Sequence, residues 1–209
     1  MQLAESLHPL LAAFTGEHVG EPRLLICLYR SPLLHVDVKF VSLEDFGVRV
    51  EDPAVLWERD GALTAVLQST RSRRPAPDPQ WIEDRFWVWI HYAATKLARC
   101  ELFEVIDMLG FLRVQVLAPL AVHARGLPPQ GVRRAETYVP EYIAALEKTL
   151  AKHDPASCGE ALQAAVTLYR ELRQPHLASL HPPRAEAEAA AVEYLASVLK
   201  QAGNSAPER

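Results

Sequence analysis

One short segment of the sequence places charged side chains between apolar ones: LLHVDVKFV, from Leu33 to Val41. Side chains of a β-strand point alternately to its two faces, so His35, Asp37 and Lys39 share one face. Carboxylate oxygens are the ligands that Mg²⁺ prefers, which makes Asp37 a candidate metal ligand on a strand. The same alternation is also typical of a half-buried strand whose polar face meets solvent.

Two further groups of charged residues could contribute to such a site. Glu58 would lie on one face of a strand if residues 54–60, AVLWERD, are extended. Lys96 and Arg99 lie one helical turn apart, and Glu101 follows them closely. Charges at this spacing also form ordinary surface ion pairs. Phosphate-binding glycine loops, the His-Glu-x-x-His zinc motif and the Gly-x-Ser-x-Gly hydrolase elbow do not occur in the sequence, so these classes of site are excluded as motifs.

The composition indicates a soluble globular protein. The chain has 209 residues, 49% of them hydrophobic and 23% charged, with a formal net charge of −4. A negative net charge argues against a surface for nucleic acid or anionic lipid, so neither nucleic acid nor a membrane is an expected partner. Three widely separated cysteines predict no disulfide framework and suit the reducing cytoplasm. The start does not resemble a signal peptide, and the most apolar run, residues 114–122, is shorter than the ~20 residues that cross a bilayer.

The first 70 residues predict a small sheet with few helices. Apolar positions from Leu3 to Phe14 have helical spacing. Residues 22–30 and the segment LLHVDVKFV predict two antiparallel strands joined by a tight turn. Further along, the pattern predicts a capped helical turn at 43–46, a short strand at 54–59, and either strand or helix at 62–69. Because so small a unit buries little surface, it needs a neighbour: the helices that follow, a second copy of the chain, or strands that precede Met1.

Residues 71–79, RSRRPAPDP, predict a linker because prolines and arginines replace the apolar pattern. The expected organisation is an α/β domain at 1–70, this linker, and a helical domain at 80–209. Helical spacing recurs throughout the last region, where about five helices would form a bundle. A capping box of Ser157 and Glu160 is expected to start one of them. The predicted fold class is therefore α+β.

The order of these segments resembles that of the nucleotidyltransferase superfamily, and in particular the bacterial aminoglycoside and lincosamide adenylyltransferases. The resemblance rests on LLHVDVKFVSLEDF and RVEDPAVLWERDG and, after the linker, on FWVWIHYAATKLARCELFEVIDMLGFLR and VLAPL. It extends from about Leu3 to about Leu150, and the later helices match only in type. It implies a partial nucleotidyltransferase-like mixed sheet, followed by an α-helical bundle that helps to hold the acceptor.

The resemblance also implies a reaction: transfer of a nucleoside monophosphate from ATP or another nucleoside triphosphate, with Mg²⁺, to a hydroxyl of a small molecule. Asp37 would be the third active-site carboxylate and a metal ligand, with Glu58 or Glu101 as the base or an acceptor contact. The residues that would contact the nucleotide phosphates are Lys39, Lys96 and Arg99.

The sequence departs from this family before Asp37. There the family carries a Gly-Ser turn followed by Asp-x-Asp, and neither occurs in this chain. Either the reading frame starts upstream of Met1, or the chain is a shortened relative that has lost catalysis, and little or no turnover is expected of this truncated form. The alternative is a non-catalytic module derived from the same fold, which binds a small molecule or forms a homodimer that covers the open sheet edge.

Overall fold

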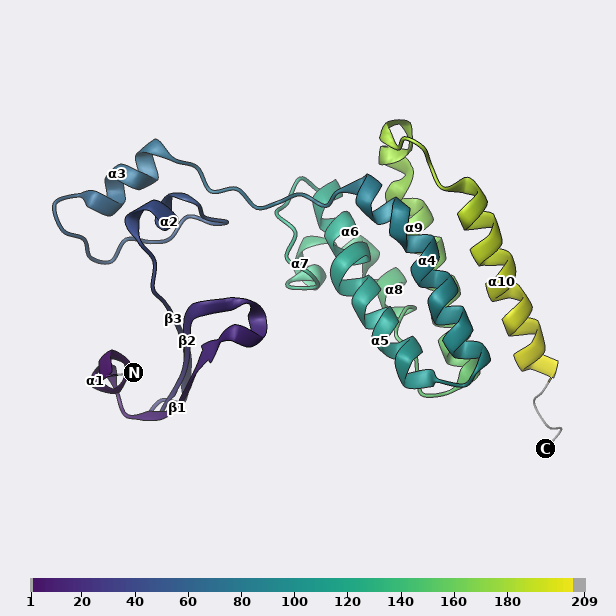
Figure 1. Ribbon diagram of the computed structural model, residues 1–209, viewed down its shortest axis with the longest axis horizontal. Coiled ribbons are helices and arrows are strands. Elements are labelled where there is room, and N and C mark those ends of the chain that lie inside the picture. The colour runs from purple at the N-terminus through teal and green to yellow at the C-terminus, as the bar shows by residue number, and fades with distance from the viewer. Residues whose placement is uncertain (1, 205–209) are drawn as a thin grey trace. The chain divides into compact units, whose positions relative to one another are not determined.

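The structure is a computed structural model that describes residues 2–204, and their side chains as far as residue 201. The chain divides between Arg74 and Pro75 into two compact units (Figure 1). The first contains an antiparallel sheet with short helices, and the second contains a bundle of helices. The fold class is therefore α+β, as the sequence predicts.

The first unit is built around three strands in the order β1-β2-β3, each antiparallel to its neighbour. Branched and long apolar side chains dominate the central strand, β2, which suits a strand with neighbours on both edges. The described sheet is thus purely antiparallel rather than mixed. The elements of this unit are α1 (Gln2–Leu7), β1 (Leu10–Gly16), a 3₁₀ turn (Glu17–Val19), β2 (Glu21–Tyr29), β3 (Leu34–Lys39), α2 (Leu43–Gly47) and α3 (Ala62–Ser69).

The two faces of this sheet have different surroundings. Cys27 on β2 is paired with Ala13 and Val36, so these side chains share a face with the other buried residues of β2, Leu25 and Tyr29. On that face α1 packs against the sheet, and the Tyr29 hydroxyl donates a hydrogen bond of 3.0 Å to the carbonyl of Ala4. The opposite face, which carries Asp37, is mostly exposed.

Two predictions for this unit are wrong. The expected helix from Leu3 to Phe14 ends at Leu7, and β1 begins at Leu10. Pro9 between them cannot donate a backbone hydrogen bond, and the residues after it pair with the next strand along the chain, β2. Residues 54–59 form a loop rather than a strand, and residues 62–69 are the helix α3. By contrast, Ser42 accepts a hydrogen bond from the Asp45 amide and starts α2 as predicted.

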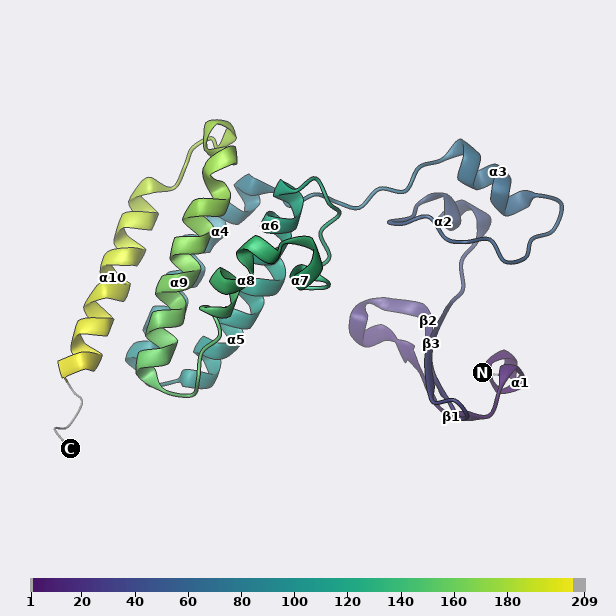
Figure 2. The same ribbon diagram turned by 180° about the vertical axis from the view of Figure 1, so that it is seen from behind.

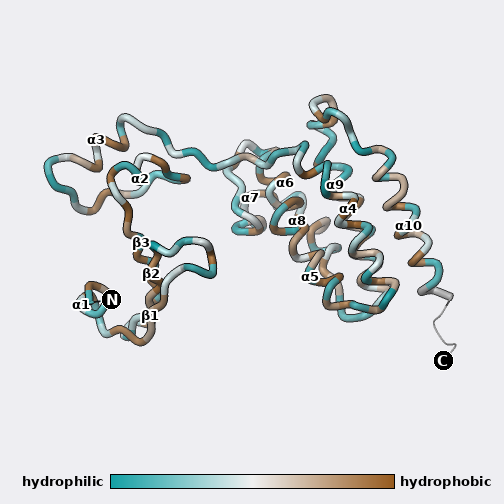
Figure 3. The backbone as a smooth tube through the Cα atoms, viewed as in Figure 1, coloured by the Kyte–Doolittle hydropathy of each residue, from teal (hydrophilic) through white to brown (hydrophobic). Residues whose placement is uncertain are grey.

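The second unit is a bundle in which α4 packs against α5, α9 and α10 (Figures 1 and 2). Its large apolar side chains recur at helical spacing and meet in one core, which contains Phe86, Ile90 and Leu109. Figure 3 shows hydrophobic and hydrophilic segments alternating along the helices of the bundle. The elements are α4 (Pro79–Ala98), α5 (Leu102–Leu112), a π-helical segment (Arg113–Leu117), α6 (Ala118–Ala124), α7 (Ala135–Tyr138), α8 (Pro140–Glu147), α9 (Pro155–Arg173), a 3₁₀ segment (Gln174–Ser179) and α10 (Ala185–Asn204).

Aspartate side chains start the two long central helices of this bundle. Asp78 accepts hydrogen bonds from the amides of Gln80 and Trp81 at the start of α4. Asp154 accepts one of 2.8 Å from the Ser157 amide at the start of α9. The predicted capping box of Ser157 and Glu160 is therefore wrong, because the helix begins at Pro155 and Asp154 occupies the capping position.

One helical run, Leu102–Ala124, is longer than the apolar stretch recognised in the sequence. Its length of 23 residues and its hydropathy would allow it to cross a membrane by those criteria alone. Within its most apolar window 56% of the residues are buried inside the bundle, as in the core helix of a soluble protein. The fold is thus consistent with a soluble protein.

Candidate functional site

Asp37 lies in the middle of β3, on the exposed face of the sheet. It is paired with Ile26 of the central strand, and its side chain is 54% exposed. The His35 Nε2 atom lies 2.9 Å from its Oδ1 atom. Two residues further along, Lys39 forms an ion pair with Glu21 on β2, with 2.5 Å between the charged atoms. The polar face of β3 thus carries a carboxylate–imidazole pair beside an ammonium–carboxylate pair.

This arrangement supplies only part of a magnesium site. Mg²⁺ requires an octahedral shell of oxygen ligands, and one aspartate provides few of them. Among residues 2–204, no group of three or more His, Cys, Asp or Glu side chains is arranged to hold a metal ion. The charge of Lys39 is also compensated, because Lys39 forms an ion pair with Glu21. Lys39 lowers the pKa of the Glu21 carboxyl group, which favours its charged form. The described residues therefore do not fit a complete metal–triphosphate site.

Glu58 has a local structural role. Its Oε2 atom accepts a hydrogen bond of 2.9 Å from the Thr64 amide, and its Oε1 atom accepts one from the Thr64 hydroxyl. These bonds hold the pKa of Glu58 below its ordinary value. Thr64 lies in the first turn of α3, where backbone amides have no partner within the helix. Glu58 therefore caps α3, and the structure provides no contact between it and Asp37 among the described residues.

The three candidates of the second unit, Lys96, Arg99 and Glu101, are brought together at the corner between α4 and α5. The Lys96 Nζ atom lies 2.8 Å from Glu101 and 3.6 Å from Glu104. The Arg99 Nε atom lies 2.7 Å from the other oxygen of Glu101. The hydrogen bond to Glu101 raises the pKa of Lys96, and those from Lys96 and Arg99 lower that of Glu101. The cations expected to bind phosphate thus neutralise carboxylates of the same corner.

The most heavily hydrogen-bonded carboxylate of the bundle was not among the predicted site residues. Glu83 of α4 is fully buried and accepts hydrogen bonds from the Tyr169 hydroxyl at 2.7 Å and from the Trp87 indole at 3.2 Å. The Arg173 guanidinium donates to both of its oxygens, at 3.0 and 3.1 Å, and the Arg184 amide donates to one. These bonds outweigh the effect of burial, so the pKa of Glu83 lies below its ordinary value.

A signal for Glu83 does exist in the sequence. Glu83 lies four residues before Trp87 and seven before Ile90, on the apolar side of a helix where a charge requires a partner. Its other partners, however, come from α9 and the start of α10 and lie 86 to 101 residues away in sequence.

A shallow groove lies on the surface of α4 and α5. Its volume is about 430 Å³. Two carboxylates, Glu104 and Asp107, lie at its edge, and the Tyr92 hydroxyl donates a hydrogen bond of 2.7 Å to Glu104. The remaining lining residues are Val88, Trp89, Tyr92, Met108 and Phe111.

Comparison with known proteins adds no relative to this description. No family model matches the chain, and a search of curated proteins finds no significant match. The case for a function thus depends on the residues and their geometry.

Proposed function

We propose that this chain is related to the nucleotidyltransferases and carries one carboxylate of their nucleotide–metal site, Asp37. The activity of the complete site would be transfer of a nucleoside monophosphate from ATP or another nucleoside triphosphate to a hydroxyl of a small molecule. The observation that supports this proposal is the position of Asp37, a half-exposed carboxylate in mid-strand on the open face of the sheet.

The proposal predicts weak nucleotide binding and little turnover by the described residues alone. Asp37 and His35 offer too few ligands for Mg²⁺, and Lys96 and Arg99 are engaged by Glu101. Further carboxylates would have to be supplied to the Asp37 face for efficient transfer. What the present residues can do is orient Asp37 on a paired strand, where the His35 imidazole contacts it.

Binding of Mg·ATP to the purified chain, measured by isothermal titration and by thermal unfolding, tests this proposal. A dissociation constant of ~1 mM at ~10 mM ligand would stabilise the folded state by about 1.4 kcal/mol, which raises the unfolding temperature by several degrees. Asp37→Asn should abolish this response. Asp60→Asn is the matched control, because Asp60 is exposed in the same unit and forms no ion pair in the described part of the chain.

A third variant separates the carboxylate from its neighbour. His35→Gln removes the imidazole that contacts Asp37 but keeps the carboxylate, so binding of Mg·ATP should persist. Loss of binding in Asp60→Asn as well as in Asp37→Asn would contradict the proposal, as would a wild-type chain that Mg·ATP does not stabilise at all. Pyrophosphate release with a panel of hydroxylated small molecules, compared with a product translated from an upstream in-frame start, would then test for transfer.

A non-catalytic binding or assembly module is the second candidate. It is favoured by the number of large apolar side chains that the first unit exposes, including Leu56 at 95%, Trp57 at 75% and Val48 at 88%. Where exposed apolar side chains form one patch, they mark a site of contact with another molecule. This candidate predicts that Asp37→Asn leaves every binding property of the chain unchanged.

A further inference from the structure

The α4–α5 face of the bundle exposes a continuous set of apolar and aromatic side chains. Val88 is 61% exposed, Trp81 is 41% exposed, and Tyr92 and Phe111 are each 38% exposed. The aromatic rings on this face contact one another. The ring centroids of Trp81 and Trp89 lie 5.6 Å apart, and those of Trp89 and Phe111 lie 5.0 Å apart. Such a continuous apolar surface on a soluble bundle indicates a site of contact with another molecule.

The contact between Trp89 and Phe111 lies near the middle of this face. The helices α4 and α5 follow each other through a short corner and run antiparallel. Lys96 near the end of α4 contacts Glu104 near the start of α5, whereas Trp89 in the middle of α4 contacts Phe111 near the end of α5. With a rise of 1.5 Å per residue, a residue four positions from this contact is displaced by about 6 Å along the helix. Residue 85 lies four positions before Trp89 on α4, and residue 107 lies four positions before Phe111 on α5. Because the two helices run antiparallel, these residues lie on opposite sides of the contact along the helix axis.

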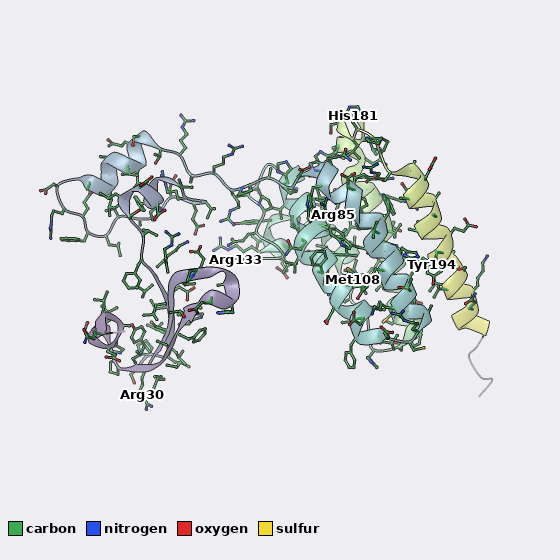
Figure 4. All side chains as sticks on the ribbon, viewed as in Figure 1. Arg30, Arg85, Met108, Arg133, His181 and Tyr194 are labelled. Carbon is green, nitrogen blue, oxygen red and sulfur yellow. The ribbon has the colours of Figure 1, made fainter. Side chains whose placement is uncertain are left out.

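These two positions carry opposite charges. Arg85 lies on α4 in the bundle (Figure 4). Its guanidinium lies 4.4 Å from the centre of the Trp81 ring and donates a hydrogen bond to the Trp81 carbonyl, but it forms no ion pair with any described residue. Asp107, at the edge of the 430 Å³ cavity, likewise has no hydrogen-bond or ion-pair partner within residues 2–204. An apolar centre is thus bordered by an unpaired cation at one end and an unpaired anion at the other.

We propose that the α4–α5 face is the interface of a homodimer. The two-fold axis would pass over the Trp89–Phe111 contact, in the plane of the interface and perpendicular to the helices. It would place the Arg85 end of each copy opposite the Asp107 end of the other. A two-fold interface uses the same surface twice, so a patch with one charge of each sign at its ends complements itself. The apolar side chains between them would be removed from water on association. This surface belongs to the bundle alone and does not depend on the nucleotidyltransferase proposal.

Sedimentation equilibrium of the full chain, over a wide range of protein concentration, measures the association. The wild type should reach a dimer, and its association should weaken at high salt because charges steer and hold the two copies. Arg85→Glu and Asp107→Arg should each weaken the dimer at least ~10-fold, since two like-charge contacts replace two attractive ones. An equimolar mixture of the two variants should form a heterodimer, in which both contacts are attractive again.

Two control variants carry the same changes of charge elsewhere on the bundle. Lys148→Glu and Glu160→Arg alter exposed residues that form no ion pair in the described structure, so both should dimerise like the wild type. Circular dichroism establishes that each variant is folded. A wild type that stays monomeric overturns the proposal, as does a dimer that survives both reversals or a mixture that fails to associate. Stabilisation of a monomer by apolar small molecules would assign the groove to a ligand instead and would also overturn it.

Discussion

Removal of the Glu83 carboxylate should destabilise the bundle more than any of the charge changes proposed above for exposed residues of the bundle. Glu83→Ala leaves the Arg173 guanidinium, whose side chain is 12% exposed, without one of its two carboxylate partners. Breaking a buried ion pair on one side costs about 3–5 kcal/mol. The Tyr169 hydroxyl and the Trp87 indole lose their acceptor as well, at about 1–3 kcal/mol for each stranded donor. These costs overlap, and we expect a loss of about 5 kcal/mol.

Glu83→Gln gives a milder and more measurable change. The amide keeps the volume and one acceptor oxygen, and Arg173 retains Glu188, so the expected loss is about 2 kcal/mol. Because domains of this size are stable by only about 5–15 kcal/mol, this variant should remain folded. Glu160→Gln on the exposed side of α9 is the matched control, with an expected change within about 0.5 kcal/mol.

Urea denaturation followed by tryptophan fluorescence measures these losses. Three of the four tryptophans, Trp81, Trp87 and Trp89, lie in the bundle, and Trp87 is 1% exposed, so its emission reports unfolding of this core. Combining Glu83→Gln with Tyr169→Phe completes a double-mutant cycle, in which residues in contact should show a coupling of about 0.5–3 kcal/mol. A Glu83→Gln protein as stable as the Glu160→Gln control, or a cycle without coupling, would refute this account of the network.

Two further predictions concern acid stability and the cap of α3. The pKa of Glu83 is lower in the folded state than its ordinary value of 4.5. Its contribution to the free energy of unfolding is therefore complete above pH 4.5 and is lost as the pH falls through the folded-state pKa. The free energy of unfolding, measured between pH 6 and about pH 3, should fall for the wild type and fall less steeply for Glu83→Gln. Glu58→Ala should expose the Thr64 amide at the start of α3, and hydrogen exchange at that amide should become faster while amides of β2 are unchanged.

Local patterns in the sequence were sufficient for much of the fold. The alternation in residues 22–30 and 33–41 correctly predicted two antiparallel strands, and the helical spacing after the linker correctly predicted a helical second unit. The helix expected from Leu3 to Phe14 was wrong because the residues of its second half pair with the residues of the next strand, β2. Hydrogen bonds between paired strands can override a helical pattern, since pairing and burial contribute more than local propensity.

For the candidate site, spacing alone identified groups but not their partners. Lys96, Arg99 and Glu101 are close in sequence, so their ion pairs follow from the geometry of a helix and its corner. Glu58 was expected on a strand, but the fold of residues 54–61 turns it back to the first turn of α3. The same charged residue can thus be a ligand or a cap, and the surrounding backbone determines which.

The sequence by itself determined the α+β class, the helical second unit and the face of β3 on which Asp37 lies, because period and composition are local properties. Only the tertiary structure decided which charges meet. It joined Glu83 to Tyr169 and Arg173, and it left Arg85 and Asp107 unpaired at opposite ends of one apolar face. The physical reason is that a charge acts over a few ångströms in space, and the distance between two side chains of different helices is set by packing of the core.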